Sequence, residues 1–315
     1  MTGSVTITPS HLFEALFADD ASQKINRSIL FNYRIPKVLT ALFAGSALSF
    51  AGLQMQTLFR NPLAGPFVLG ISSGASLGVA LLVLSGFGIM GAMSAYGVAI
   101  ASIIGSSFVL LLILLASFNI KDSMSLLLIG IMFGAFTAAI VSILQFFSTA
   151  QDIQSYLFWT FGATGNLSLN ELSLFIPLII TGVIVGFSQI KQLDVLLLGE
   201  SYAKSLGLKI NRTRIALVLS TSILAGIVTA FCGPIAFLGL AVPHFSRLLH
   251  KTSSHQILIP SVLLVGACAL ILCDIIAQLP GLDLVLPINA VTSLFGAPVV
   301  IWLIIKRKNI TRTFG

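Results

Sequence analysis

The sequence has few charged residues, because Asp, Glu, Lys and Arg together make up 9% of its 315 residues. A water-soluble domain carries about 25% charged residues, so this shortage excludes a soluble fold. Apolar residues make up 57% of the chain, and the mean hydropathy is +1.04. The composition therefore predicts an all-α, polytopic membrane protein, and the formal net charge of +7 reflects membrane topology rather than a surface that binds nucleic acid.

Residues for several kinds of chemistry are also scarce. The three cysteines, Cys232, Cys268 and Cys273, lie in apolar runs without the spacing of metal ligands. The chain has no G-x-x-x-x-G-K-[ST] loop, so it does not hydrolyse nucleotide itself. Asp274 is the one acid well inside an apolar run. It is either a functional group or an acid that hydrogen-bonds a neighbouring helix. Because ion-coupled transporters carry ionisable residues at mid-membrane depth, a transporter of this composition needs energy from a partner.

Nine apolar runs are long enough to predict membrane-spanning helices. They cover residues 38–58, 67–84, 92–117, 124–147, 172–190, 214–231, 235–249, 257–278 and 288–305. The seventh run is short and contains Pro243, His244 and Arg247. With nine crossings and an inner C-terminus, 13 of the 17 Lys and Arg lie inside; without the seventh crossing, only seven do. The positive-inside rule therefore favours nine crossings.

The four basic residues that nine crossings place outside all precede the first span: Lys24, Arg27, Arg34 and Lys37. A basic flank normally holds an N-terminus in the cytoplasm. The first 37 residues contain no apolar run long enough for a signal peptide or a helix. We therefore expect that a helix upstream of Met1 is absent from this chain, with a genuine nine-helix form as the alternative.

Two nine-residue stretches hint at an internal repeat. AGSALSFAG at 44–52 and AGIVTAFCG at 225–233 share the pattern A-G-x4-F-x-G. In the predicted topology they run in opposite directions, as an inverted repeat requires. Close helix packing through glycines is the alternative explanation.

The stretch GISSG at 70–74 has the pattern of a serine nucleophile elbow. Such an elbow needs a strand before it, whereas a proline-rich loop and an apolar run flank this one. An intramembrane serine hydrolase that uses Ser72 or Ser73 with His244 is an alternative without a plausible triad. We interpret the small residues from 70 to 78 as one face of a closely packed helix.

The largest loop on the predicted cytoplasmic side spans residues 191–213. Its segment LGESYAKSLGLK predicts a short helix that begins near Glu200 and ends at Gly207. Such a helix can serve as a lever for an attached ATPase. A solvated connector with basic residues is the alternative.

Ordered motifs resemble the permeases of type II ABC importers, which take up iron–siderophore complexes, haem and vitamin B12. The motifs are RIPK at 34–37, a helix with Gly45, Gly52 and Gln56, RNPLAGP at 60–66, LGISSGA at 69–75, WTFG at 159–162, LGExxAxxLG at 198–207, GPIAFLGLAVPH at 233–244 with Arg247 beyond it, and LPxNxVTxLFGAP at 286–298. Members of this family usually have ten helices with both ends in the cytoplasm. The chain is similar to helices two to ten, from about residue 30 onward.

The resemblance implies a transmembrane permease domain at 38–306, between an outer-face segment at 1–37 and a basic cytoplasmic tail at 307–315. It also implies four groups of site residues. These are Gly199, Glu200, Ala203, Leu206 and Gly207 for coupling to the ATPase; Arg34 and Lys37 for docking of the binding protein; Ser123 and Met124 for the cytoplasmic gate; and Gln145, Asn289, Thr292 and Ser293 for the pathway. A third basic docking position of some relatives falls on Gln278, so the docking patch is expected to differ here.

The partners implied by the resemblance are an ABC ATPase that carries ATP and Mg²⁺, an extracytoplasmic binding protein, a second permease copy and membrane lipid. The chain itself would be a transport subunit in a bacterial cytoplasmic membrane, with a cytoplasmic C-terminus, no enzymatic activity, and no cofactor or metal of its own. Its expected function is import of an iron chelate, haem or cobalamin by alternating access. A metal-ion ABC permease and an ion-coupled secondary transporter are the alternatives.

Overall fold

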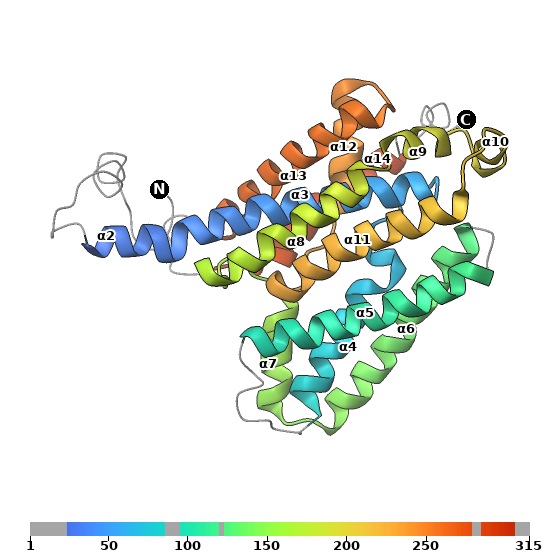
Figure 1. The fold of residues 1–315 in the computed structure, drawn as a ribbon. Helices are drawn as coiled ribbons and strands as arrows, with labels where there is room; N and C mark the ends of the chain where they lie inside the picture. The colour runs from blue at the N-terminus through green and yellow to red at the C-terminus, as the bar shows by residue number, and fades with distance from the viewer. Residues whose placement is uncertain (1–23, 86–94, 120–122, 279–284, 306–315) are drawn as a thin grey trace.

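The computed structural model describes residues 24–85, 95–119, 123–278 and 285–305 (Figure 1). Its elements are α2 (Lys24–Ile29), η2 (Leu30–Arg34), α3 (Ile35–Leu58), η3 (Pro66–Leu69), α4 (Ile71–Leu84), α5 (Ala95–Asn119), α6 (Ser123–Phe147), α7 (Ala150–Thr160), α8 (Leu169–Phe187), α9 (Ile190–Leu196), α10 (Glu200–Ser205), α11 (Ile210–Cys232), α12 (Leu238–His250), α13 (His255–Ala277) and α14 (Ile288–Ile305). Every element in these ranges is helical, so the all-α prediction is confirmed there.

Each of the nine predicted spans coincides with helical structure. Within the described ranges, six helices are long and apolar enough to cross a membrane, and α4 and α14 are shorter apolar helices. The seventh predicted span corresponds to α12, which has 13 residues. The chain is thus a multi-pass membrane protein, while the count of nine crossings and the inverted repeat stay predictions.

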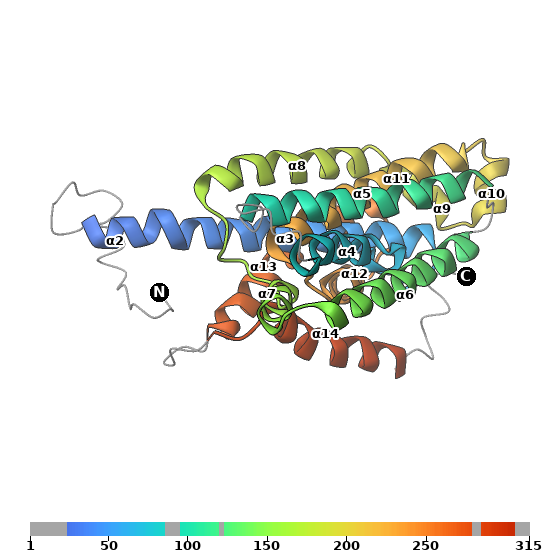
Figure 2. The same cartoon turned by 90° about the horizontal axis from the view of Figure 1, so that it is seen from below.

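Helices α3 and α11 form the centre of the bundle. Helix α3 packs against α8, α11, α12 and α13, and α11 packs against α5 and α8 as well. Seen from below in Figure 2, α5, α8 and α11 lie on one side, and α6, α7 and α14 lie on the other. The middle of the molecule is therefore made by α3 and the helices that contact it, while α6 and α14 remain near one surface.

Glycine lets α3 approach its neighbours closely. A Cβ built on Gly52 would lie 1.8 Å from the carbonyl oxygen of Gly239 in α12, and one on Gly45 would lie 2.2 Å from the carbonyl oxygen of Gly266 in α13. Backbones can come this near only where side chains are absent, which is how membrane helices gain packing energy. The glycines of α3 therefore hold α12 and α13 against it.

The small-residue face predicted for residues 70–78 is confirmed. Gly74 and Gly78 bring α4 against α5, where a Cβ would lie 2.6 Å from the Gly105 carbonyl oxygen and 2.1 Å from that of Ala101. Gly70 precedes α4 with a φ of 71°, a conformation that favours glycine. A 3-10 turn, not a strand, comes before this glycine, so the segment lacks the geometry of a serine elbow.

The first helix begins earlier than the sequence predicts. Helical structure is continuous from Lys24 through α2, η2 and α3 to Leu58, so the expectation of no helix before residue 38 is wrong for this part. The apolar stretch Ile25–Leu58 has 34 residues, about 51 Å at 1.5 Å per residue, which exceeds a hydrocarbon core of about 30 Å. Figure 1 shows α2 projecting beyond the bundle. Residues 1–23 and the predicted tail at 307–315 lie outside the described residues.

Helix α7 was not predicted, because its 11 residues are too few and too polar to form an apolar run. Thr149 caps it by accepting a hydrogen bond from the Asp152 backbone N–H at 3.3 Å. Its C-terminal end meets the loop between α11 and α12, where the Ala163 N–H donates to the Cys232 carbonyl at 2.8 Å. The WTFG motif therefore joins α7 to the loop of the GPIAF motif.

Candidate functional site

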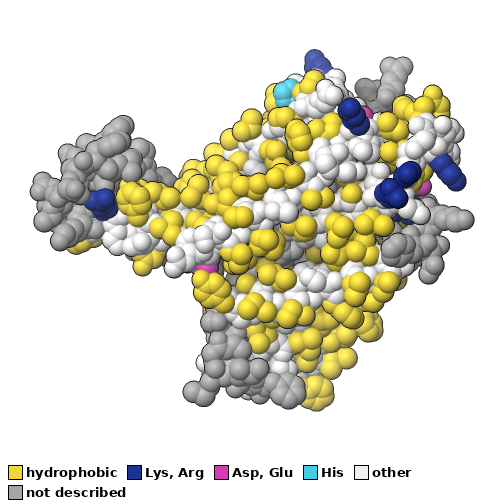
Figure 3. All heavy atoms as spheres, viewed as in Figure 1, with side chains coloured by type: hydrophobic (Ala, Val, Ile, Leu, Met, Phe, Trp, Pro, Cys, Tyr) yellow, Lys and Arg dark blue, Asp and Glu magenta, His cyan; other side chains and the backbone are white. Residues whose placement is uncertain are grey.

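Helices α9 and α10 lie together at one end of the bundle, and we call residues 190–207 the coupling segment. Figure 3 shows Lys and Arg side chains near this end, with apolar side chains over the body of the molecule and further basic atoms beside α2. A basic end of a membrane protein normally faces the cytoplasm. The arrangement agrees with the predicted position of the 191–213 loop.

Helix α10 begins where the sequence predicts and ends at Ser205, two residues before the predicted terminal glycine. It begins at Glu200, after Gly199 with a φ of 101°. At its other end the Gly207 N–H donates to the Lys204 carbonyl, and the Leu208 N–H donates to the Ala203 carbonyl, each at 3.0 Å. This pair of bonds is a Schellman motif, and Gly207 supplies the left-handed conformation it needs, with a φ of 84°.

Two predicted coupling residues contact the body of the protein. Ala203 is fully buried, and it packs α10 against the body. Glu200 Oε1 accepts a hydrogen bond from Arg214 Nη2 of α11 at 3.2 Å, and the Arg214 side chain is 1% exposed. Arg214 was not predicted as a site residue, since a basic residue at the start of a span is indistinguishable in sequence from an ordinary positive-inside charge. These contacts fix the orientation of α10 relative to α11.

An apolar strip on the coupling segment is exposed. Leu198, Tyr202 and Leu206 are 57%, 57% and 58% exposed. Tyr202 and Leu206 are four residues apart on one side of α10, and Leu198 lies in the turn before Gly199. Apolar side chains that gather on a surface outside the bilayer mark an interaction site. Of the three, only Leu206 was predicted; the repeat of large apolar residues every four positions was the available signal for the others.

The opposite end of the bundle holds a polar cluster around Asp274. Its carboxylate accepts a hydrogen bond from the Thr164 hydroxyl and one from Gln278 Nε2 at 2.9 Å, and Lys37 Nζ lies 3.3 Å from Oδ2. The Lys37 side chain is 25% exposed. Asp274 is therefore an acid that hydrogen-bonds neighbouring elements, the second of the two alternatives that the sequence left open. Arg34 lies one helical turn before Lys37, so the two predicted docking residues share this end.

The four pathway candidates lie on α6 and α14, and two of them have structural bonds. Asn289 Oδ1 accepts a hydrogen bond from the Ala236 backbone N–H at 3.1 Å, and the Thr292 hydroxyl donates to the Asn289 carbonyl at 3.1 Å. Thr292 is buried, whereas Gln145 and Ser293 are half-buried. The structure therefore gives Asn289 a role in joining α14 to the loop before α12.

The predicted gate residues, His244 and the metal-ligating residue types complete the comparison with the structure. Ser123 and Met124 form the first turn of α6, and their role as a gate stays a prediction. His244 Nε2 lies 3.0 Å from the Pro62 carbonyl oxygen, a contact between α12 and the loop after α3. Among the described residues, no group of three or more His, Cys, Asp and Glu is placed to hold a metal ion.

Comparisons with known proteins agree on one family. The profile of the FecCD transport family matches residues 1–306. The hemin transport system permease protein HmuU of Yersinia pestis is 36% identical over 281 residues, which are 89% of this chain and 84% of that protein. The vitamin B12 import system permease protein BtuC of Salmonella paratyphi A is 36% identical over 278 residues, or 88% and 83% of the two chains.

Solved structures show the same fold. A metal-chelate type ABC transporter in an inward-facing conformation has 31% sequence identity and a TM-score of 0.82, with coverage of 94% of this chain and 96% of that one. PsaBC from Streptococcus pneumoniae in complex with Fab has a TM-score of 0.61 at 16% identity, with coverage of 93% and 99%. The second likeness supports the fold alone.

Proposed function

The chain belongs to the FecCD transport family, and from this premise we propose that it is the permease of an ATP-driven importer for a bulky metal chelate or tetrapyrrole. The family membership makes it a multi-pass transport subunit, with ATP hydrolysis left to a separate protein. The proposal adds the energy source, the substrate class and the roles of individual residues. Three features of the molecule support it, one at each end and one between them.

The exposed apolar strip of the coupling segment is the observation that carries the proposal. Leu198, Tyr202 and Leu206 are each more than half exposed at the basic end of the bundle. Water contact with three large apolar side chains is unfavourable, and a groove on an ATPase subunit would remove it. Gly199, Glu200, Ala203 and Gly207 would then shape and anchor the helix that enters this groove. ATP and Mg²⁺ would be bound by the ATPase subunit.

At the other end, Lys37 and Arg34 would receive an extracytoplasmic binding protein. Basic side chains steer and orient an acidic partner more than they add affinity. Lys37 already lies beside Asp274, so an acidic group of the binding protein would share this lysine rather than meet an isolated charge. Gln278 also donates a hydrogen bond to Asp274. Because Gln278 is uncharged, the patch is less basic than it would be with a third basic residue at this position.

The substrate pathway would lie between two permease copies, along the side that presents α6 and α14. Figure 2 shows both helices on the same side of the molecule. Large apolar side chains on them are exposed, among them Met132 and Phe136 on α6 and Leu294 and Phe295 on α14. Gln145 and Ser293 would add polar groups to this wall. Alternating access would follow from movement of the coupling segments below it, with Ser123 and Met124 at the inner gate.

The relatives support the proposed substrate class. The two permeases are named for hemin and vitamin B12, and the solved transporter is described as a metal-chelate type. All three ligands are large and hold a metal in an organic ligand. We therefore propose an iron chelate, haem or cobalamin as cargo.

Co-purification with an ATPase and a binding protein tests the proposal. The tagged chain would be isolated with both partners, and ATP hydrolysis would be measured with iron–siderophore complexes, haem and cobalamin. The proposal predicts a stable complex whose hydrolysis rises when the binding protein carries one of these ligands. Absence of an ATPase partner would reject it.

A further inference from the structure

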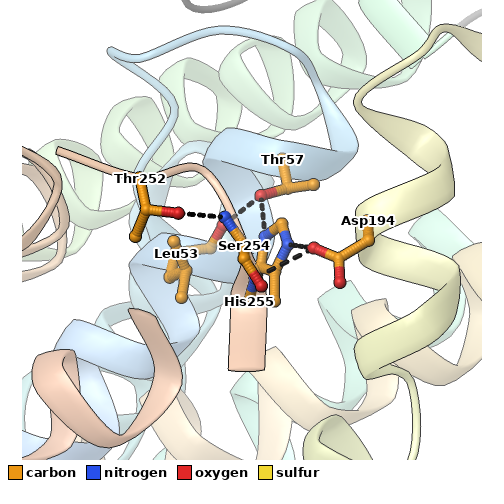
Figure 4. Close-up of polar contacts among 6 residues, drawn as sticks. All are labelled: Leu53, Thr57, Asp194, Thr252, Ser254 and His255. Carbon is orange, nitrogen blue, oxygen red and sulfur yellow. Dashed lines mark hydrogen bonds and ion pairs between the residues drawn. The ribbon is translucent and has the colours of Figure 1, made fainter. Parts of the chain in front are cut away.

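His255 connects three elements that are distant in the sequence (Figure 4). It is the first residue of α13 and is 1% exposed. Its ring Nδ1 lies 2.7 Å from Asp194 Oδ1 of α9, and its Nε2 lies 2.9 Å from the Thr57 hydroxyl at the end of α3. The Thr57 Oγ1 atom also lies 3.0 Å from the Leu53 carbonyl oxygen of the same helix. One imidazole therefore joins the coupling segment to two helices of the bundle.

Asp194 also caps α13. The residue before this helix, Ser254, makes no side-chain capping bond. The His255 backbone N–H donates to Asp194 Oδ1 at 2.9 Å instead. A carboxylate at a helix N-terminus satisfies an otherwise unpaired N–H and interacts favourably with the helix dipole. Helix α9 thus holds the end of α13 by two hydrogen bonds to one carboxylate oxygen.

The two helices reached through His255 form one packed unit. Gly45 and Gly266 bring α3 and α13 into backbone contact, and the same pair contacts α9. The coupling segment continues from α9 into α10 after three residues, so a displacement of α10 acts on α9 directly. Because close-packed helices resist separation, a pull on the end of α13 moves α3 with it.

We propose that the Asp194–His255–Thr57 hydrogen bonds transmit displacement of the coupling segment to α3 and α13, with His255 as the positioning residue. This inference rests on the proposed function, in which an ATPase moves that segment. Glycine packing holds α3 and α13 together, and the three polar side chains connect that pair to α9. Loss of the connection would let the ATPase move α9 and α10 while α3 and α13 lag behind.

The test measures ATP hydrolysis and substrate uptake together in vesicles that contain the complete importer. Two variants break the connection from opposite sides: Asp194→Ala removes the carboxylate, and Thr57→Val removes the hydroxyl without changing side-chain size. Each is expected to lower the amount of substrate moved per ATP by about fivefold, the effect of losing one intramolecular hydrogen bond. The double variant should be little worse than either single one, because both act on one connection.

Two further variants separate transmission from general loosening. Asp194→Asn keeps an acceptor oxygen and should restore most of the uptake per ATP. Ser261→Ala is the matched control. Ser261 also lies on α13, and the variant removes its 3.0 Å contact with the imidazole of His250 in α12, which does not involve α9. It should transport like the parent. Were Ser261→Ala to lose as much uptake per ATP as Asp194→Ala, the connection would have no special role.

The remaining outcomes also decide between the two proposals. Unchanged uptake per ATP in both Asp194→Ala and Thr57→Val overturns this inference and leaves the proposed function intact. If Asp194→Ala does not assemble, Thr57→Val decides alone. A parent complex that shows no ATP-dependent uptake overturns the proposed function, and this inference falls with it.

Discussion

Gly45→Ala adds a single methyl group where α3 meets α13. The new Cβ would lie 2.2 Å from the Gly266 carbonyl oxygen, and ordinary contact begins at 3.4 Å, so the helices must separate by about 1.2 Å. Because two backbones cannot change rotamer, the cost should reach the upper part of the overpacking range, about 3 kcal/mol. Helix propensity opposes this by about 1 kcal/mol in favour of Ala. The net expectation is a loss of about 2 kcal/mol of stability.

The repeat-related glycine supplies the control. Gly226 occupies the same position in the second AG pattern, but a Cβ there would meet only the Ser106 side chain at 3.4 Å and more distant atoms. Gly226→Ala should therefore be neutral or slightly stabilising. In purified protein the midpoint of thermal unfolding should fall by about 3 °C for Gly45→Ala and stay level or rise for Gly226→Ala. Equal midpoints for the two variants would refute the packing argument.

Three further changes test the sites. Leu206→Asp places a charge in the exposed apolar strip and should reduce co-purification of the ATPase subunit at least about fivefold; undiminished recovery would remove the strip from the interface. Lys37→Glu places a second carboxylate beside Asp274 and should weaken binding of the loaded binding protein about tenfold, most strongly at low salt. The affinity would be measured by titrating the stimulation of ATP hydrolysis, and an affinity equal to that of the parent would exclude Lys37 from docking. Asn289→Leu leaves the Ala236 N–H without its acceptor and should cost about 1–3 kcal/mol in thermal stability, whereas Asn289→Asp keeps the acceptor; equal losses would count against that bond.

Local patterns in the sequence predicted the helices well. Each apolar run of sufficient length coincides with helical structure, because the bilayer demands such runs. The short helix at Glu200 was predicted because its glycine C-terminal signal is local, and Gly207 has the expected left-handed backbone. Helix α7 was not predicted, because it is too short to cross a bilayer and contains no long apolar run. The T-x-x-D pattern at Thr149 and Asp152 was the signal that could have revealed it.

Side-chain partners were harder to predict than helices. Lys37 was predicted to lie on the outer surface, but its contact with Asp274, more than two hundred residues later, was not predicted. His255 was not predicted as a site residue, and its partners Asp194 and Thr57 are 61 and 198 positions away. Such pairs depend on which helices pack together and in which rotation, and one sequence contains no direct record of that. Burial of Arg214 was hidden for the same reason.

The central claim is that ATP, used by a partner, drives uptake through this permease. The most direct measurement is uptake of a radiolabelled iron chelate, haem or cobalamin by vesicles that hold the permease, its ATPase and its binding protein. Uptake is expected to require ATP and the binding protein, and to persist when an uncoupler removes the proton gradient. Uptake that continues without ATP and collapses with the uncoupler would contradict the account and favour an ion-coupled transporter.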